Sequence, residues 1–305
     1  MFNFPSLTSG LIALIFLGLT GCQNNRIEVQ KQKVGDVELA YYTRGSGEPL
    51  VLLMGYKGTM AMWDPAFIEE LATNYTVIAF DHRGVGLSTD SKENHTTIAQ
   101  MSTDTAGLIR ALGYQKVHLL GWSMGSSIAM QVALDHPEIL KTLILCAPNP
   151  GGKNQAYRPE VYDKLTSLHT SKEELLSLMF PETSQGHLAA AAFIARLKKA
   201  IVEGAVPNDV DINQQTIKRQ SSALQSRSTD NHLYDLLPTI KVPTLVAGGM
   251  QDVIDPPENA QAVASRIPFA WAAYFPGSGH GFTSQDYLQF SRLIHVFTES
   301  ENTIE

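Results

Sequence analysis

The sequence predicts an α/β protein in which helices cover both faces of a mostly parallel sheet. Short apolar runs alternate along the chain with segments of helical periodicity, and this alternation is typical of such a sheet. One apolar run, at residues 117–120, leads directly into a glycine-flanked turn and then into a helical segment. With 305 residues, 44% of them hydrophobic and 17% charged, the chain can form one large domain with an insertion.

The first half of the predicted domain covers residues 27–148. Two opening strands flank the Gly35-Asp36 turn and are expected to form a hairpin. The helix that ends at Gly113 has a typical C-terminal stop. The predicted elements are strands at 27–34, 37–43, 50–54, 75–80, 117–120 and 142–146, and helices at 65–73, 98–112 and 126–134.

The second half covers residues 236–305 and contains strands at 244–247 and 271–275 and helices at 257–265 and 285–297. Between the halves, residues 149–235 hold amphipathic segments and turn signals without a convincing strand. This segment is too long for a plain loop, so we predict a helical insertion. An insertion at this point lies over the carboxyl edge of the strands, where ligands bind.

The N-terminal segment predicts export. Residues 1–21 carry no charge, and the apolar run at 11–19 is too short to span a bilayer. Leu19-Thr20-Gly21-Cys22 resembles the lipobox of bacterial lipoproteins, which implies a signal peptide at 1–21, lipidation of Cys22 and a tether at 22–26. In a Gram-negative host, Gln23 and Asn24 resemble an outer-membrane sorting signal. The first basic residue is only Arg26, so an uncleaved anchor or a misassigned start codon stays open.

Composition excludes several classes of function. The net charge of −7 and the short basic clusters argue against a nucleic-acid surface. Apart from Cys22 the only cysteine is Cys146, inside an apolar run, so no disulfide framework is available and this thiol is expected to be buried. Neither Cys-x-x-Cys nor closely paired histidines occur, so no metal site is expected.

The segment Gly121-Trp122-Ser123-Met124-Gly125 is typical of a nucleophile elbow. A serine on a tight strand-to-helix turn adopts strained backbone angles, and glycines two residues before and after it leave room for the chain. The turn exposes the hydroxyl and directs N–H groups of the helix start toward an oxyanion. The spacing alone is weak evidence, because it arises by chance in roughly one chain in ten of this length.

Further motifs give the elbow its context. Asp-x-Arg-Gly-x-Gly-x-Ser stands at 81–88, Gly-x-x-Asp-x-x-x-Pro at 249–256 and Gly-x-Gly-His-Gly at 277–281. With these motifs in this order, the chain resembles the α/β-hydrolase family along almost all of residues 35–300. The resemblance implies a mostly parallel eight-stranded sheet with helices on both faces, a helical cap insertion and no cofactor.

The candidate catalytic residues are Ser123, His280 and Asp252. An alcohol is a poor nucleophile at neutral pH and needs a base such as histidine. Of nine histidines, only His280 lies in a glycine-rich loop between a predicted last strand and last helix. A carboxylate must orient that base; Asp252 fits by its place after a strand, and Asp255 is the fallback. The chain order Ser, Asp, His is the one this fold uses.

Other histidines have structural interpretations. His118 lies within a predicted strand and is expected to be packed. His136 stands at a helix end, where it can interact with the helix dipole. His82 belongs to the turn after the fourth strand and is expected to make loop contacts.

The predicted oxyanion hole combines the N–H groups of Met124 and Tyr56, the latter in the loop after the third strand. The family commonly has His-Gly before this position, whereas this chain has Met54-Gly55. The backbone donor survives this change, although an ordinary loop role for Tyr56 and Lys57 stays open.

Apolar side chains near these loops suggest a pocket for an acyl or alcohol group. Trp63, Trp122 and Phe282 are its candidate walls, although Met62 and Trp63 equally fit the start of a core-packed helix. The whole group comprises Tyr56, Met60, Met62, Trp63, Trp122, Met124 and Phe282. Four residues of the insertion have helical spacing typical of a core: Leu175, Leu178, Met179 and Phe180.

These observations predict an exported, lipid-anchored serine hydrolase that acts on a small-molecule acyl substrate through an acyl-enzyme. A carboxylic ester is the expected substrate, with amides, lactones and carbon–carbon bonds of diketones left open. Gly-Trp-Ser-Met-Gly also resembles the elbow of cofactor-free haloperoxidases and perhydrolases. A non-catalytic surface-binding lipoprotein on the same scaffold is a further alternative.

Overall fold

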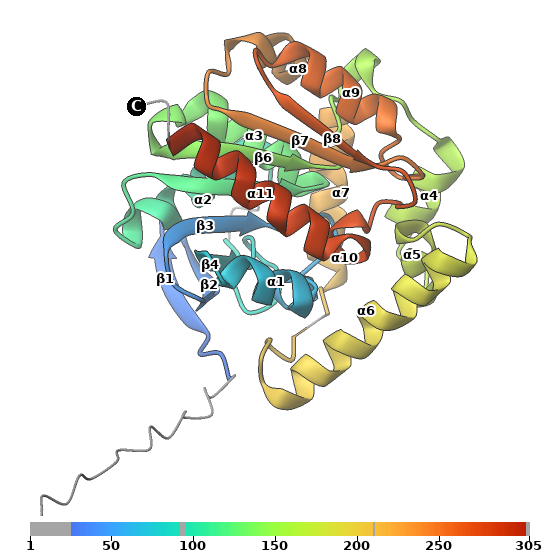
Figure 1. Cartoon of the computed structure of the whole chain (residues 1–305), viewed down its shortest axis with the longest axis horizontal. Coiled ribbons are helices and arrows are strands. Elements are labelled where there is room, and N and C mark those ends of the chain that lie inside the picture. Colours follow the sequence, from blue (N-terminus) through green and yellow to red (C-terminus); the bar gives the residue numbers. More distant parts are fainter. Residues whose placement is uncertain (1–25, 92–95, 210, 303–305) are drawn as a thin grey trace, which may run out of the picture.

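The computed structural model describes residues 26–91, 96–209 and 211–302, so the predicted signal peptide, Cys22 and most of the tether lie outside the described residues. Its centre is an eight-stranded sheet of order β1-β2-β4-β3-β5-β6-β7-β8 (Figure 1). Strand β2 is antiparallel to β1 and β4, and all other neighbours are parallel. The strands are β1 (Gln30–Val34), β2 (Val37–Arg44), β3 (Glu48–Leu53), β4 (Tyr75–Phe80), β5 (Val117–Trp122), β6 (Leu140–Cys146), β7 (Thr244–Gly249) and β8 (Trp271–Phe275).

Helices cover both faces of the sheet, which confirms the predicted fold class. Side chains alternate across β5, so Leu119 packs into one buried cluster and Leu120 into the other. Helices α2 (Ile98–Ala111), α3 (Met124–Asp135) and α9 (Pro257–Arg266) pack in the first cluster. Helices α1 (Pro65–Ala72) and α11 (Tyr287–Asn302) pack in the second, and in Figure 1 they cross in front of the sheet.

In its described part, the segment between β6 and β7 contains helices joined by turns and loops, and no strand. Its helices are α4 (Pro159–Thr166), α5 (Lys172–Met179), α6 (Ser184–Glu203), α7 (Gln214–Thr229) and α8 (His232–Leu236). Local signals start and stop them: Ser171 and Glu174 form a capping box before α5, and Gly204 ends α6 at φ +70°. Phe180, Phe193 and Leu197 bury one another in a small separate cluster. We call residues 149–235 the cap.

Several predicted boundaries differ from the structure, and two of the differences have a clear physical reason. The first strand begins at Gln30 and not at 27, because the Ile27 N–H donates to Gly204 O at the end of α6 instead of to the sheet. The closing helix, predicted at 285–297, begins at Tyr287 as α11, and a separate short helix, α10 (Phe282–Gln285), precedes it. Asp286 separates them and accepts a hydrogen bond from the Ser278 hydroxyl, which bends the chain there.

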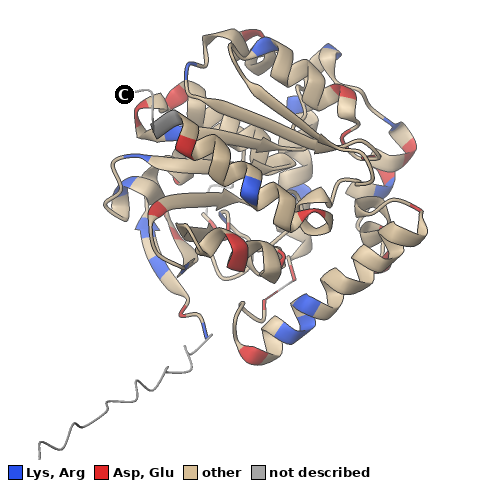
Figure 2. Cartoon of the chain, viewed as in Figure 1, with Lys and Arg blue, Asp and Glu red and all other residues tan. Residues whose placement is uncertain are grey.

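Short 3-10 turns complete the described elements, at Met60–Met62 (η1), Pro137–Ile139 (η2), Gly152–Asn154 (η3) and Leu237–Thr239 (η4). Within the described ranges, no helix has both the length and the apolar character needed to cross a bilayer. Acidic and basic segments are interspersed over the ribbon (Figure 2).

Candidate active site

Ser123 lies in the turn between β5 and α3 with φ 58° and ψ −122°. Such angles are rare for a residue with a side chain and are held only where the surroundings enforce them. The Ser123 N–H donates to Cys146 O at 2.9 Å. The Ser126 hydroxyl lies 2.6 Å from Gly121 O and 2.8 Å from Cys146 O and shares its one proton between them. These contacts with β5 and β6 lock the strained turn.

The two elbow glycines allow close approach of backbone segments. A Cβ atom on Gly121 would lie 2.2 Å from Gly125 O, and one on Gly125 would lie 2.1 Å from Leu53 O at the end of β3. Both distances are far below van der Waals contact with rigid backbone atoms. The strand-to-helix turn therefore fits against β3 only with glycine at both positions.

His280 and Asp252 form a buried pair. His280 Nδ1 and Asp252 Oδ2 are 2.7 Å apart, and both residues are almost fully buried. Asp252 Oδ1 accepts the N–H groups of Ile254 at 2.8 Å and Asp255 at 2.9 Å, which fixes the carboxylate. Burial lowers the pKa of His280, but the charge and hydrogen bond of Asp252 outweigh it, so the pKa is raised overall. The pair thus favours an imidazole that binds a proton readily.

The His280 loop lies beside the elbow. Trp122, the residue before Ser123, donates its indole N–H to His280 O at 3.0 Å, and the two rings have centroids 4.9 Å apart. Within the described residues the Ser123 hydroxyl makes no hydrogen bond to His280. Such contacts are often long in a resting enzyme and tighten when substrate binds. His280 is therefore bonded to Asp252, and its loop contacts Trp122, the residue before Ser123.

The loop after β3 passes directly over the elbow. A Cβ on Gly55 would lie 3.0 Å from Ser123 Cβ. In the part of the chain that the structure describes, the N–H groups of Tyr56 and Met124 have no acceptor. Two free backbone donors beside the serine are the arrangement that an oxyanion hole needs.

The aromatic residues near the elbow are packed against one another. Trp63 and Phe282 are 2% and 0% exposed, and Trp122 is 9% exposed. The ring of Phe282 lies between Phe275 and Phe290, at centroid distances of 5.2 and 5.0 Å. This packing explains the burial of Phe282 without any contact to a substrate. Trp122, in contrast, contacts the proposed base His280 directly.

The motif at 81–88 is structural support for the site. Asp81 Oδ1 accepts the Met60 N–H at 2.7 Å and its Oδ2 accepts the Leu87 N–H at 3.0 Å. Burial raises the pKa of Asp81 to about 7. His82 Nε2 lies 3.2 Å from Met54 O, just before the loop over the elbow, and burial lowers the pKa of His82 to about 4. His82 therefore makes loop contacts in the neutral form.

The other residues singled out in the sequence have packing roles. His118 is fully buried, with Nδ1 2.8 Å from Thr142 Oγ1 and Nε2 2.9 Å from Glu48 Oε2, so its predicted packing is confirmed. His136 is the C-cap residue of α3. Cys146 is buried, and burial raises the pKa of its thiol. A buried thiol of raised pKa is inert.

A polar network near His280 joins Asp255, the fallback carboxylate, to two asparagines that no sequence motif marks. The Asp255 carboxylate accepts the side-chain amides of Asn149 at 2.7 Å and Asn259 at 3.3 Å. Burial raises the pKa of Asp255 to about 6, although the nearby His280 lowers it. Asn149 follows β6 at the carboxyl edge of the sheet, and this position is the only signal that marks it in the sequence.

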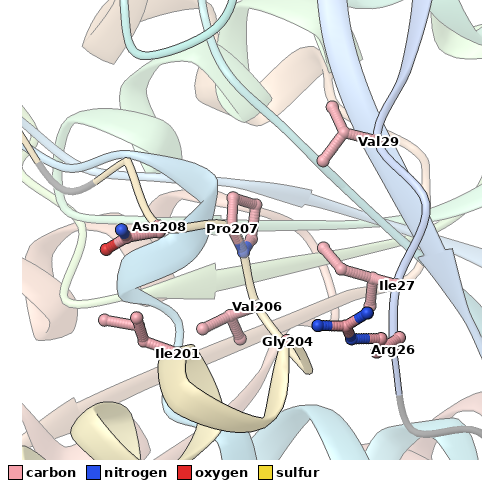
Figure 3. A pocket seen from close by; sticks show the side chains of 8 residues that line it. All are labelled: Arg26, Ile27, Val29, Ile201, Gly204, Val206, Pro207 and Asn208. Carbon is pink, nitrogen blue, oxygen red and sulfur yellow. The ribbon is translucent and has the colours of Figure 1, made fainter.

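A separate hollow of about 310 Å³ lies between the N-terminal segment and the end of α6 (Figure 3). It is lined mostly by apolar residues, and none of the candidate catalytic residues borders it. The lining residues are Arg26, Ile27, Val29, Ile201, Gly204, Val206, Pro207 and Asn208. Among the described residues, no group of three His, Cys, Asp or Glu side chains is arranged to hold a metal ion.

The chain is similar in sequence to known proteins along most of its length. A protein of Caulobacter vibrioides (strain NA1000 / CB15N) named "Putative carbamate hydrolase RutD" is 27% identical over 281 residues, which cover 89% of this chain and 99% of that protein. "Putative non-heme bromoperoxidase BpoC" of Mycobacterium tuberculosis (strain CDC 1551 / Oshkosh) is 28% identical over 274 residues, covering 86% of this chain and 98% of that one.

The solved structure of a thermophilic esterase from Thermogutta terrifontis, with malate bound, is 25% identical and has a TM-score of 0.68. The alignment covers 90% of this chain and 99% of the esterase. The family model described as alpha/beta hydrolase fold matches residues 48–282. Since this match spans most of the chain and the strand order, elbow and loops agree with it, the chain belongs to the alpha/beta hydrolase fold family and is a hydrolase.

Proposed function

We propose that the protein is a serine hydrolase that cleaves a carboxylic ester through an acyl-enzyme. The observation that carries the proposal is the buried His280–Asp252 pair at 2.7 Å, beside the strained turn that presents Ser123. Similarity to an esterase of 25% identity supports an ester substrate. A carbamate is the related acyl group favoured by the similarity to the RutD protein.

In the proposed reaction, Ser123 Oγ attacks the carbonyl carbon while His280 Nε2 takes the hydroxyl proton. The N–H groups of Tyr56 and Met124 donate to the oxyanion, and Asp252 stabilises the imidazolium that forms. The tetrahedral intermediate collapses, and the alcohol leaves with the proton from His280. Water then attacks the acyl-serine with the same help and releases the acid and free Ser123.

The first test is covalent labelling with a fluorophosphonate probe. We expect stoichiometric modification of the wild-type protein, complete loss of it in Ser123→Ala, and full retention in Ser222→Ala, since Ser222 is an exposed serine of α7. Intact-protein mass spectrometry measures each case. An unmodified wild-type protein after long exposure would contradict a serine hydrolase and favour a binding role.

Substrate class is tested with p-nitrophenyl esters of graded acyl length. The apolar surroundings of the elbow favour acyl chains longer than acetyl. A second activity, peracid formation with hydrogen peroxide as acceptor, is favoured by the similarity to the bromoperoxidase BpoC. Peracid formation faster than ester hydrolysis would make it the main function.

We further propose that the protein is exported and lipid-anchored to the bacterial envelope through Cys22. The support is the apolar segment that precedes Leu19-Thr20-Gly21-Cys22. The anchor would consist of several acyl chains, which bind a bilayer far more firmly than one chain does.

A further inference from the structure

The turn that carries the proposed oxyanion donor is bonded to the cap. Gly55, Tyr56, Lys57 and Gly58 form a tight turn, in which the Gly58 N–H donates to Gly55 O at 3.2 Å. Lys57 has φ 59°, in the left-handed region that favours glycine. A turn with a non-glycine residue there needs contacts that enforce it. We call residues 55–58 the oxyanion turn.

Cap helix α7 supplies two of those contacts. Gln220 Oε1 accepts the Lys57 N–H at 3.1 Å. Ser221 Oγ lies 2.6 Å from the Tyr56 hydroxyl, and because Ser221 donates its own proton to Ile217 O at 2.9 Å, Tyr56 is the donor. Consecutive residues of one cap helix therefore hold consecutive residues of the turn.

Cap helix α4 supplies two more. Lys57 Nζ donates to Leu165 O and Ser167 O, both at 2.8 Å, at the C-terminal end of α4. This end of a helix carries partial negative charge, which suits an ammonium group. The pKa of Lys57 is lowered because burial removes its ammonium group from water.

Attachment of the cap to the core does not by itself explain Gln220. It is fully buried, and its Nε2 has no hydrogen-bond partner in the described part of the chain. An unpartnered buried donor lowers stability, so an apolar residue of similar size would suit packing at least as well. The cap is also attached elsewhere, since Thr216 of the same helix donates its hydroxyl to Gly84 O at 2.7 Å. Holding the cap on the core therefore does not by itself require a glutamine at position 220.

We propose that Gln220 and Lys57 are positioning residues that couple the seating of the cap to the geometry of the oxyanion turn. When α4 and α7 are seated, their bonds fix the Tyr56–Lys57 peptide and the Tyr56 side chain, and through them the adjoining Gly55–Tyr56 peptide, whose N–H is the proposed donor. When they lift, the turn loses the contacts that enforce its left-handed residue. The inference rests on the proposed serine hydrolase function and on Tyr56 as an oxyanion donor.

The test compares Gln220→Met with Thr216→Val, which removes a cap-to-core bond of the same helix outside the oxyanion turn. Because an oxyanion donor stabilises the transition state and not the substrate, its displacement in Gln220→Met should lower kcat about tenfold and change KM less than about twofold. Thr216→Val should keep kcat within about twofold of wild type, since the turn is untouched. Thermal unfolding of both variants measures the structural cost separately.

A second readout reports on the oxyanion itself. An aryl trifluoromethyl ketone forms a hemiketal oxyanion on the serine, so its Ki should rise in Gln220→Met by the factor by which kcat/KM falls. Lys57→Met should behave in the same way, and Lys57→Arg should recover part of the loss. Ser221→Ala provides the test if Gln220→Met does not fold.

Different results would overturn the proposed hydrolase function and the proposed coupling of the cap to the oxyanion turn. Wild-type protein that neither hydrolyses esters nor reacts at Ser123 would overturn the proposed function. Active wild-type protein together with unchanged kcat and Ki in Gln220→Met, or with an equal loss in Thr216→Val, would overturn only the coupling of cap and oxyanion turn.

Discussion

At the residue scale, the charge of His280 is decided by two opposing effects. Burial disfavours the imidazolium, and the Asp252 carboxylate at 2.7 Å favours it more strongly. The Asp255 carboxylate raises the pKa of His280 further. A general base must be neutral to accept a proton, so this balance sets the acid side of the pH profile.

We therefore expect kcat/KM of the wild-type enzyme to fall on the acid side with a midpoint above 6.5, the ordinary pKa of histidine. In Asp252→Asn the raising effect of this carboxylate is lost, while desolvation and the smaller effect of Asp255 remain, so the midpoint should move to lower pH. The value of kcat should fall by about 10⁴-fold because the tautomer is no longer held. Rates measured from pH 5 to 9 check this.

Asp255→Asn is the matched variant, because an asparagine oxygen can still accept the amides of Asn149 and Asn259. We expect a smaller shift of the same midpoint to lower pH with most of kcat retained. If Asp255→Asn abolishes activity while Asp252→Asn keeps it, the roles of the two carboxylates are reversed. An acid limb that stays in place in both variants would argue against His280 as the base.

At the scale of the elements, the elbow depends on backbone segments that pack without side chains between them. We expect Gly121→Ala to lower the free energy of unfolding and to abolish activity, because its Cβ would lie 2.2 Å from Gly125 O. Relief of that contact requires the strand-to-helix turn to open, and the expected cost is about 3 kcal/mol or more.

Gly248→Ala in strand β7, two strands from β5 in the sheet, is the control. Its Cβ would lie 3.6 Å from the Ala260 side chain, an ordinary contact, so stability should change by less than about 1 kcal/mol. Urea unfolding of the two variants measures the difference. Equal stabilities would mean that the elbow tolerates a Cβ and that its glycines serve another purpose.

The predicted elements and motifs explain which parts of the fold could be read from the sequence. The strand at 75–80 and the helix at 65–73 are set by local apolar spacing, and the structure has them at Tyr75–Phe80 and Pro65–Ala72. The break between α10 and α11 depends on the Ser278–Asp286 contact, which no local pattern encodes. Local patterns thus place elements, while tertiary contacts set some of their ends.

The same distinction applies to the site. Ser123, Asp252 and His280 stand in compact motifs, each with its own glycine or proline signal. Gln220 and Ser221 stand in α7, where nothing in the spacing marks them. Their role comes from the way the cap folds back over the core, which a single sequence does not reveal.

At the scale of the whole molecule, the cap touches both loops of the proposed site. Gln220 and Ser221 hold the oxyanion turn, and Met179 O, at the end of α5, accepts the Gly281 N–H beside His280 at 2.7 Å. Arg196 of α6 also binds the buried Asp64 at the start of α1. The cap is thus part of the site and not only its cover.

The described chain starts next to the end of α6. Ile27 donates to Gly204 O at 2.9 Å, and Val202 nearby in sequence is 84% exposed. The hollow of Figure 3 lies beside this contact, since Ile27 and Gly204 are among its lining residues.

The anchor gives a prediction for the intact protein in a bacterial host. Wild-type protein should sediment with membranes and incorporate labelled palmitate, because several acyl chains bind a bilayer firmly. Cys22→Ser should lose the label and leave the membrane fraction, whereas Cys146→Ala, which alters a buried thiol, should keep both. Label retained in Cys22→Ser would place the modification elsewhere. Membrane association without any label would instead favour an uncleaved apolar segment, since such a segment holds the chain without acylation.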